Sequence, residues 1–209
     1  MKEKELERLQ KLKQIEEEIY INSNVKYICG IDGAGRGPLA GPVVVASVIM
    51  PKDSMIEGVN DSKKVSEKKR EELYEKIISE AISYGVGIID EKEIDRINIL
   101  NATKLALTTS LKELSQKPDI ILVDALTKID TLGIPYKSII KGDALCYSIS
   151  AASIIAKVTR DRIMRQWDEV YPIYGFEKHK GYGTSTHILA IKEYGLCPIH
   201  RRSFTKKFV

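Results

Sequence analysis

The sequence predicts a single α/β domain from three observations. Residues 119–125, DIILVDA, form an almost wholly apolar run of strand length, which is typical of a strand covered on both faces. Short runs rich in Val and Ile alternate along the chain with segments whose apolar residues recur at helical spacing. With 209 residues, 43% of them hydrophobic, the chain is long enough for one domain with a sizeable core.

The first half of the chain predicts a surface helix, two strands and a second helix. Helical spacing predicts a helix over residues 2–20 that packs on the domain, and we assign residues 1–24 to this helix and its linker. Residues 27–32 and 43–50 are the first two predicted strands. A helix is expected to begin at an N-cap near Ser66 and to end near Gly85. Its buried face is predicted to contain Leu73, Ile77, Ala81 and Ile82.

The second half predicts three more strands and two helices. Residues 86–89 form the third strand, and a helix follows over about residues 98–115, with Leu107, Leu111 and Leu114 buried. Residues 119–125 and the shorter segment 137–141 are the fourth and fifth strands. A long helix is predicted from about Ser148 to Trp167 and ends before Pro172.

Aspartates lie at the ends of predicted strands. Asp32 and Asp124 each close an apolar strand, and Asp143 directly follows another. A single aspartate in such a place is usually a turn former or a helix cap. If the first and fourth strands are neighbours, however, the three carboxylates converge and repel one another, which requires a cation. Oxygen ligands of this kind favour Mg²⁺ or Mn²⁺ over zinc or copper.

The segment GIDGAGRGPLAGP, residues 30–42, surrounds the first of these aspartates. Its turn, Gly35-Arg36-Gly37, can bring backbone N–H groups close to a phosphate, although the same glycines could merely shape a connection between strands. Residues 35–40 also match the G-x-G-x-x-A pattern of dinucleotide-binding proteins. That pattern needs a helix after the turn, whereas two prolines and a β-branched run follow here, which argues against it.

Charge and cysteine content narrow the function classes. The net charge is +4, but residues 157–209 hold 11 lysines and arginines against 5 acidic residues, which favours a polyanionic partner. No apolar run is of membrane-spanning length, the N-terminus is charged, and 3 widely spaced cysteines argue against a disulfide framework. We therefore expect a cytoplasmic protein. Cys197 and His200 lie close together, but no second ligand pair supports a zinc site.

Ordered motifs after Tyr27 resemble the ribonuclease HII family. They are GIDGAGRGPLAGP (30–42), NDSKK (60–64), LVDA (122–125), KGDA (141–144), ISAASIIAKVTRDRIM (149–164), YGFEKHKGYGTSTH (174–187) and HRRSF (200–204). The resemblance implies a ribonuclease H-like fold, with a mixed five-stranded sheet flanked by helices and a C-terminal helical extension, over residues 25–209.

The same resemblance implies an activity and a cofactor. The family cleaves the RNA strand of RNA–DNA hybrids, and it cuts 5′ of single ribonucleotides embedded in duplex DNA. Two divalent metal ions serve this reaction. Matched by motif, Asp32, Asp124 and Asp143 are the expected ligands of Mg²⁺ or Mn²⁺. We expect a monomer whose partner is an RNA–DNA hybrid or ribonucleotide-containing DNA, with no membrane partner.

Substrate-binding positions are also carried over by motif. Gly35, Arg36 and Gly37 are expected near the 2′-hydroxyl that distinguishes RNA from DNA, and Tyr182 is expected to pack on the ribonucleotide sugar. Ser62 and Lys63 are expected to contact phosphate. Weaker candidates for phosphate contact are Lys157, Arg160, Lys180, Arg201 and Arg202.

One catalytic position departs from the family pattern. Where the family reads Asp-Glu-Ala-Gly-Arg-Gly, this chain has Gly33 in place of the glutamate. Gly33 supplies no carboxylate, so cation affinity and cleavage are expected to fall while the fold and hybrid binding are retained. The alternative is a hybrid-binding protein that does not cleave. Asp61 and Asp161 are conceivable substitute ligands, but nothing in the sequence supports either.

Overall fold

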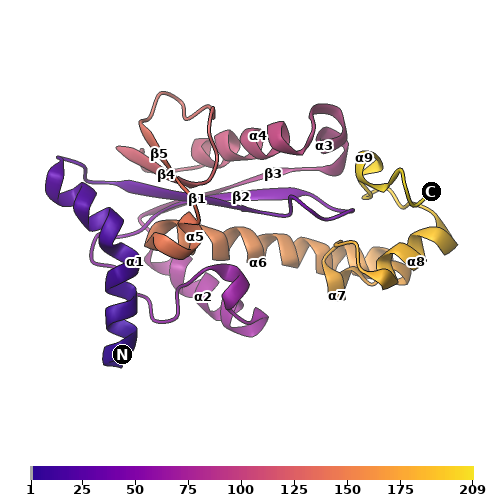
Figure 1. Ribbon diagram of the computed structural model, residues 1–209, viewed down its shortest axis with the longest axis horizontal. Coiled ribbons are helices and arrows are strands. Elements are labelled where there is room, and N and C mark those ends of the chain that lie inside the picture. Colours follow the sequence, from indigo (N-terminus) through magenta and orange to yellow (C-terminus); the bar gives the residue numbers. More distant parts are fainter. Residues whose placement is uncertain (1) are drawn as a thin grey trace.

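The computed structural model describes residues 2–209 and has a five-stranded sheet between two layers of helices (Figure 1). The sheet order is β3-β2-β1-β4-β5. Antiparallel pairing joins β1 (Ile28–Ala34), β2 (Val43–Ile49) and β3 (Ser83–Ile89). Parallel pairing joins β1 to β4 (Ile120–Asp124), and β4 to β5 (Tyr136–Ile139). The expected mixed five-stranded sheet is therefore confirmed.

Helices cover both faces of the sheet (Figure 1). On one face lie α6 (Tyr147–Val170) and α2 (Glu67–Glu80), and on the other lies α4 (Ile99–Lys112), preceded by α3 (Glu91–Ile97). The long N-terminal helix is α1 (Glu3–Asn22). The short elements are α5 (Gly142–Leu145), α7 (Phe176–His179), α8 (Ser185–Tyr194), α9 (Arg202–Thr205) and the 3₁₀ turns η1 (Ser62–Lys64) and η2 (Pro172–Tyr174).

Alternation along β1 divides the core between the two faces. Cys29 and Ile31 pack with α4, whereas Ile28 packs with the start of α6. At Gly30, an added Cβ would lie 2.1 Å from the backbone carbonyl carbon of Ser148. Glycine therefore lets α6 lie directly against the central strand. This close packing sets the distance between the strand that carries Asp32 and the N-terminal end of α6.

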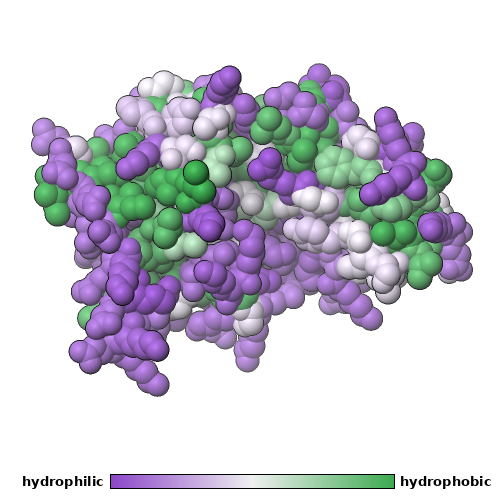
Figure 2. Space-filling model, in the orientation of Figure 1, coloured by the Kyte–Doolittle hydropathy of each residue, from purple (hydrophilic) through white to green (hydrophobic). Residues whose placement is uncertain are grey.

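The N-terminal helix packs on the domain. Leu9 and Leu12 are buried in the same apolar cluster as α2 and α6. The polar side chains Lys13 and Glu16 are also buried, and Lys13 donates hydrogen bonds to the carbonyls of Lys52 and Ser54. Figure 2 shows hydrophilic residues over the N-terminal half of α1 and hydrophobic residues near its other end.

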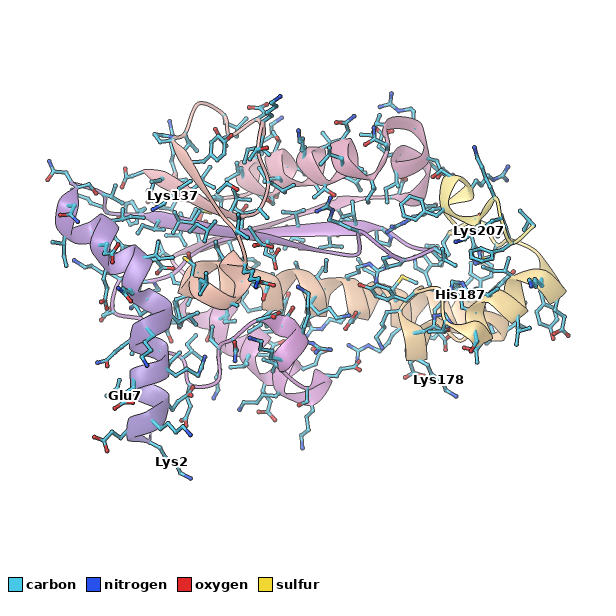
Figure 3. The ribbon with its side chains drawn as sticks, in the orientation of Figure 1. Lys2, Glu7, Lys137, Lys178, His187 and Lys207 are labelled. Atoms are coloured by element: carbon cyan, nitrogen blue, oxygen red, sulfur yellow. The ribbon has the colours of Figure 1, made fainter. Side chains whose placement is uncertain are left out.

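The C-terminal helical part has its own small core. Leu39, Phe176, Ile191 and Ile199 are among its buried residues. Figure 3 places His187 within this part, whereas Lys178 extends outward from it. None of the helices formed by residues 2–209 combines the length and the apolarity needed to span a lipid bilayer.

The end of the second helix is predicted wrongly. Ser66 is its N-cap as expected, but α2 ends at Glu80, and Ile82 is 42% exposed. Gly85 lies within β3, where it pairs with Ser47, instead of ending a helix. The chain leaves the helix at Ala81 in an extended conformation, so β3 pairs with the full length of β2. Tertiary pairing therefore outweighs the glycine signal.

Short helices are missing from the prediction. The expected helix over residues 98–115 begins one residue later, because Asn98 has a φ of 67° and its side chain caps α4. Before it lies α3, whose N-cap Asp90 accepts a hydrogen bond from the N–H of Glu93. The single turn α5 is also absent from the prediction. Both are too short to show a helical period, and capping side chains define α3 instead.

Candidate active site

The three aspartates come from two neighbouring strands and the turn after a third. Since β1 and β4 are parallel neighbours with Ile31 opposite Val123, Asp32 and Asp124 follow at the same edge of the sheet. The condition set for the carboxylates to converge, that the first and fourth strands are neighbours, is therefore met. Alternation directs both side chains to the face occupied by α5 and α6. Asp143 lies on α5 on that face.

A hydrogen bond and two tight turns hold α5 against the end of β4. Oδ1 of Asp124 accepts a hydrogen bond of 2.7 Å from the N–H of Gly142. The residue after Asp124, Ala125, and the residue before Gly142, Lys141, both have positive φ, at 46° and 58°. Positive φ at residues other than glycine is sparsely populated and often marks a functional site. The two turns thus bring α5 against the end of β4.

The carboxylates share an unfavourable environment. Burial raises the pKa of Asp32 to about 8, and the negative charges of Asp124 and Asp143 contribute to this shift. Burial also raises the pKa of Asp124. Nζ of Lys63 lies 2.9 Å from Oδ2 of Asp143, and this hydrogen bond raises the pKa of Lys63. The charges therefore favour a cation among the three carboxylates.

The donor chemistry suits a hard divalent cation, since all three side chains offer carboxylate oxygens. Within residues 2–209, however, no three His, Cys, Asp or Glu side chains are arranged closely enough to hold one metal ion. In this arrangement the ammonium group of Lys63 lies against Asp143. By ligand type, the three aspartates fit Mg²⁺ or Mn²⁺.

A cavity of about 290 Å³ lies beside the aspartates and gathers the candidate residues. Leaving the weaker phosphate candidates aside, all the expected catalytic and binding positions except Asp143 line it: Asp32, Gly33, Gly35, Arg36, Gly37, Ser62, Lys63, Asp124 and Tyr182. Its other lining residues are Ala34, Thr103, Leu126 and Lys157. A larger cavity of about 400 Å³ lies between α3 and the C-terminal segment, away from the aspartates, so the smaller cavity is the relevant one.

The turn after β1 forms one wall of this cavity. Gly35 has a φ of +92°, and an added Cβ would lie 2.1 Å from Nε of Arg160, so only glycine fits. Arg36 and Gly37 are exposed. Tyr182 is 44% exposed, and its Cε1 would lie 3.8 Å from a Cβ at Gly37. The turn and the aromatic ring therefore face the same space.

Two of the weaker phosphate candidates were predicted wrongly. Arg160 and Arg201 are 1% and 0% exposed, and their guanidinium groups donate to backbone carbonyls, so neither can touch a phosphate. Lys180 is 7% exposed and pairs with Glu67. Arg202 is exposed, but it lines the other cavity. Of this group, only Lys157 lines the cavity beside the aspartates.

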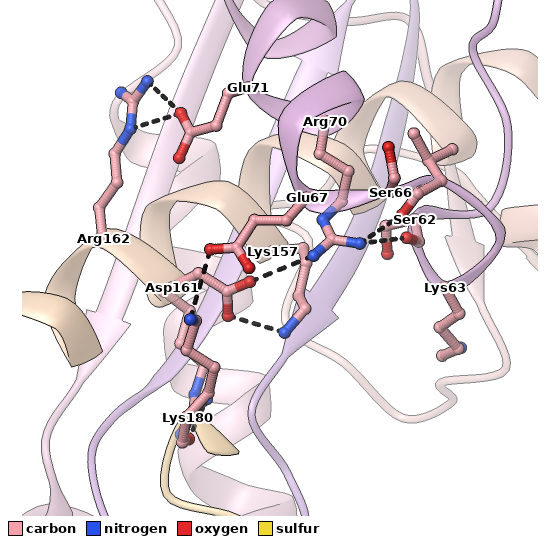
Figure 4. Close-up of polar contacts among 12 residues, drawn as sticks. Ser62, Lys63, Ser66, Glu67, Arg70, Glu71, Lys157, Asp161, Arg162 and Lys180 are labelled. Atoms are coloured by element: carbon pink, nitrogen blue, oxygen red, sulfur yellow. Dashed lines mark hydrogen bonds and ion pairs between the residues drawn. The ribbon is translucent and has the colours of Figure 1, made fainter. Parts of the chain in front are cut away.

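An ion-pair network between α2 and α6 supports the Ser62-Lys63 segment (Figure 4). Asp161 pairs with Lys157 at 2.7 Å and with Arg70 at 3.5 Å. Arg70 in turn donates a hydrogen bond of 3.1 Å to the carbonyl of Ser62. Asp161 is thus occupied in this network. Asp61 caps η1 by accepting a hydrogen bond from the N–H of Lys63.

Sequence reasoning missed polar residues that support the site. Ser150 donates a hydrogen bond of 2.8 Å to the carbonyl of Asp143, and the hydroxyl of Ser153 accepts one from the N–H of Ser62. Thr103 of α4 also lines the cavity. The serines lie within the motif of residues 149–164, but a small polar residue in an apolar helix gives no sign of its partner.

Comparisons with known proteins agree with this architecture. The family model for Ribonuclease HII matches residues 29–207. A ribonuclease HII from Acetivibrio thermocellus is 58% identical over 207 residues, which cover 99% of this chain and 80% of that protein. The crystal structure of ribonuclease H2 from Pyrococcus horikoshii OT3 superposes with a TM-score of 0.74 at 30% identity, over 87% of this chain and 96% of the other.

A more distant structure shares the fold alone. Bst-RNase HIII in complex with Mn²⁺ superposes with a TM-score of 0.64 at 18% identity, over 81% of this chain and 63% of that one. The ribonuclease H-like fold is thereby confirmed. Because the family model and the close relatives span nearly the whole chain, this protein belongs to the ribonuclease HII family and is a ribonuclease H, a hydrolase.

Proposed function

We propose that this chain is a metal-dependent endonuclease whose ligands are Asp32, Asp124 and Asp143. Its substrates are RNA–DNA hybrids, cut in the RNA strand, and duplex DNA, cut 5′ of single ribonucleotides. The observation that carries the proposal is the grouping of three carboxylates at one edge of the sheet, where the pKa of Asp32 rises to about 8. The Mn²⁺ complex of Bst-RNase HIII supports a divalent cation.

Asp32, Asp124 and Asp143 would hold the cation, which would supply Lewis-acid activation of the attacking water and stabilisation of the leaving 3′ oxygen. The protein's own residues bind and orient the substrate. The exposed turn at Arg36-Gly37 presents backbone N–H groups to phosphate, and Tyr182 packs on the sugar whose 2′-hydroxyl marks a ribonucleotide. Ser62 and Lys63, which also line the cavity, contact the phosphate backbone of the nucleic acid.

Gly33 is proposed to weaken this site. It lies next to Asp32 on β1 and contributes no oxygen ligand beyond its backbone. Loss of one carboxylate lowers the affinity for divalent cations. Loss of positioning commonly costs orders of magnitude in rate, so cleavage is expected to be strongly reduced while hybrid binding is retained. The second candidate function, a hybrid-binding protein that does not cleave, rests on this same residue.

The test is cleavage of a labelled DNA duplex that contains one ribonucleotide. This chain is compared with Gly33→Glu, each with Mg²⁺ and with Mn²⁺. We expect the glutamate variant to cut 5′ of the ribonucleotide and the unmodified chain to cut far more slowly. Equal cutting by both would show that three aspartates suffice, or that another ligand is recruited.

Two matched variants separate charge from steric effects. A Cβ at position 33 would lie 3.1 Å from Cγ2 of Val45 and 3.3 Å from the carbonyl of Val44, so any side chain requires a small shift. Gly33→Ala measures that shift, and Gly33→Gln has the size of glutamate without its charge. A gain seen with Glu and absent with Gln assigns the effect to the carboxylate.

The remaining parts of the proposal concern organisation. We assign residues 25–209 to one catalytic domain to which residues 1–24 are attached, and we infer that the protein acts as a cytoplasmic monomer. Sedimentation of the purified chain, alone and with a hybrid duplex, tests the monomer: a dimer without substrate would contradict it.

A further inference from the structure

Two guanidinium groups lie buried beneath the turn that faces the cavity. Arg160 comes from α6 and Arg201 directly precedes α9. Their exposed fractions are 1% and 0%, and no carboxylate in residues 2–209 forms an ion pair with either. Burial lowers the pKa of Arg160 to about 10 and that of Arg201 to about 9. Buried charges without a counter-ion are expensive, so their presence calls for an explanation.

Arg201 binds the inner side of the turn through carbonyl oxygens. It donates hydrogen bonds to the carbonyls of Gly35 at 2.6 Å, Arg36 at 3.1 Å, Gly41 at 2.9 Å and Pro42 at 3.1 Å. A planar guanidinium with several fixed donors suits this task, whereas an ammonium group does not. Arg201 thus fixes both ends of the turn at once.

Arg160 joins the turn to the loop that carries Tyr182. It donates hydrogen bonds to the carbonyls of Pro42 at 2.9 Å, Ala40 at 3.1 Å and Lys180 at 2.9 Å. Its guanidinium carbon also lies 5.9 Å from the centre of the Tyr182 ring. One side chain therefore sets the spacing between the glycine turn and the aromatic ring.

This arrangement leaves the outer side of the turn to a ligand. With its carbonyls bound from beneath, the turn has exposed residues at Arg36 and Gly37. No hydrogen bond among residues 2–209 uses the backbone N–H of either one. Two positive charges lie directly under these groups, in a medium that screens them less than water does. Anions on the outer side would be attracted by both.

We propose that Arg160 and Arg201 are positioning residues of the substrate site. They fix the turn at Arg36-Gly37 against Tyr182, and their charge is balanced by the phosphates of the bound nucleic acid, which they do not touch. This inference rests on the proposed function, since it takes that face to be where the hybrid binds.

The test measures the Kd of a fluorescein-labelled RNA–DNA hybrid by anisotropy, with Ca²⁺ in place of Mg²⁺ to limit cleavage. Arg160→Met is expected to weaken binding by about tenfold or more, because a displaced turn loses its contacts. The matched control is Arg162→Met. Arg162 lies on the same helix but pairs with Glu71 on the outer surface, and its loss should change Kd by less than about twofold.

The salt dependence of Kd distinguishes positioning from direct contact. Loss of a direct phosphate contact reduces the slope of log Kd against log salt by about one. Arg36→Ala is expected to do so, whereas Arg160→Met should weaken binding while the slope changes by much less than about one, because the phosphates that its charge attracts do not touch it. A purely structural role would lower the melting temperature of Arg160→Met and leave the Kd of the folded protein as it was.

Each outcome decides between the inference and the proposed function. If the unmodified chain does not bind the hybrid, the proposed function fails. If it binds and folded Arg160→Met binds equally well, or if the salt slope falls by about one, only the inference is overturned. Should Arg160→Met not fold, Arg160→Lys replaces it. Lysine keeps the positive charge but lacks the planar set of guanidinium donors, so binding is expected to weaken. An affinity equal to that of the wild type would refute the positioning role.

Discussion

Removing the carboxylate of Glu16 is expected to destabilise the start of the helix that lies behind the aspartates. Glu16 belongs to α1, is buried, and accepts a hydrogen bond of 2.7 Å from the N–H of Ser148. It also accepts one of 3.0 Å from the thiol of Cys146. The N-cap residue Cys146 makes no side-chain cap hydrogen bond, so the carboxylate of Glu16, from a distant part of the chain, caps the N-terminus of α6 instead.

The magnitude follows from these contacts. In Glu16→Ala, the cap is lost and a buried N–H has no partner, which costs about 2 kcal/mol of unfolding free energy. For a chain of this length, that lowers the melting temperature by about 4–8 °C. Glu16→Gln keeps the accepting oxygen without the charge and is the matched control.

The pH dependence separates the two variants. Burial raises the pKa of Glu16 above its ordinary 4.5. The folded protein therefore binds the proton more tightly than the unfolded chain. The stability this contributes is fully present below pH 4.5 and is lost as pH rises through the folded pKa. Glu16→Gln does not titrate, so its stability relative to the wild type should increase as pH rises.

Urea unfolding at about pH 5 and about pH 8 measures both effects. Glu16→Gln should match the wild type at the lower pH and exceed it at the higher one, and Glu16→Ala should be the least stable at about pH 5. The reasoning is refuted if Gln is as destabilising as Ala at the lower pH, because the cap would then contribute nothing. It is also refuted if the difference between Gln and wild type does not change with pH.

Two further predictions concern the glycine turn and the histidines of the C-terminal part. Gly35→Ala should lower the free energy of unfolding by about 2 kcal/mol or more and weaken hybrid binding, because the added Cβ would overlap Arg160. Gly133 also has a positive φ but has open space around it, so Gly133→Ala is the control and should cost about 1 kcal/mol in the same unfolding assay. Burial lowers the pKa of His187 and of His200 from 6.5 to about 4. The free energy of unfolding that this shift contributes should be fully present above pH 6.5, and it should fall by on the order of 3 kcal/mol for one histidine by about pH 4. A flat urea stability profile through this window would contradict the second prediction.

The strands and their aspartates could be predicted because their signals are local. The segment DIILVDA is apolar enough to identify a strand buried on both faces, and Asp124 marks the end of that strand. To place Asp32 and Asp124 at the same edge of the sheet, only the adjacency of β1 and β4 had to be assumed, and the strand pairing shows that adjacency. Asp143 differs in that its place depends on α5, a single turn that has no period to detect.

The polar residues that support the site could not be predicted in the same way. Glu16 and Arg201 look like ordinary charged surface residues, yet their partners lie 132 and 166 positions away, at Ser148 and Gly35. A buried charge is tolerated only when the fold supplies its hydrogen-bond partners, and a local pattern contains no information about those partners. Such residues are therefore taken for exposed ones, as Arg160 was when it was counted among the candidates for phosphate contact. The same reasoning gives a guide for related chains: a charged residue within a motif of small and apolar residues should be tested for a backbone partner before it is taken as a contact to nucleic acid.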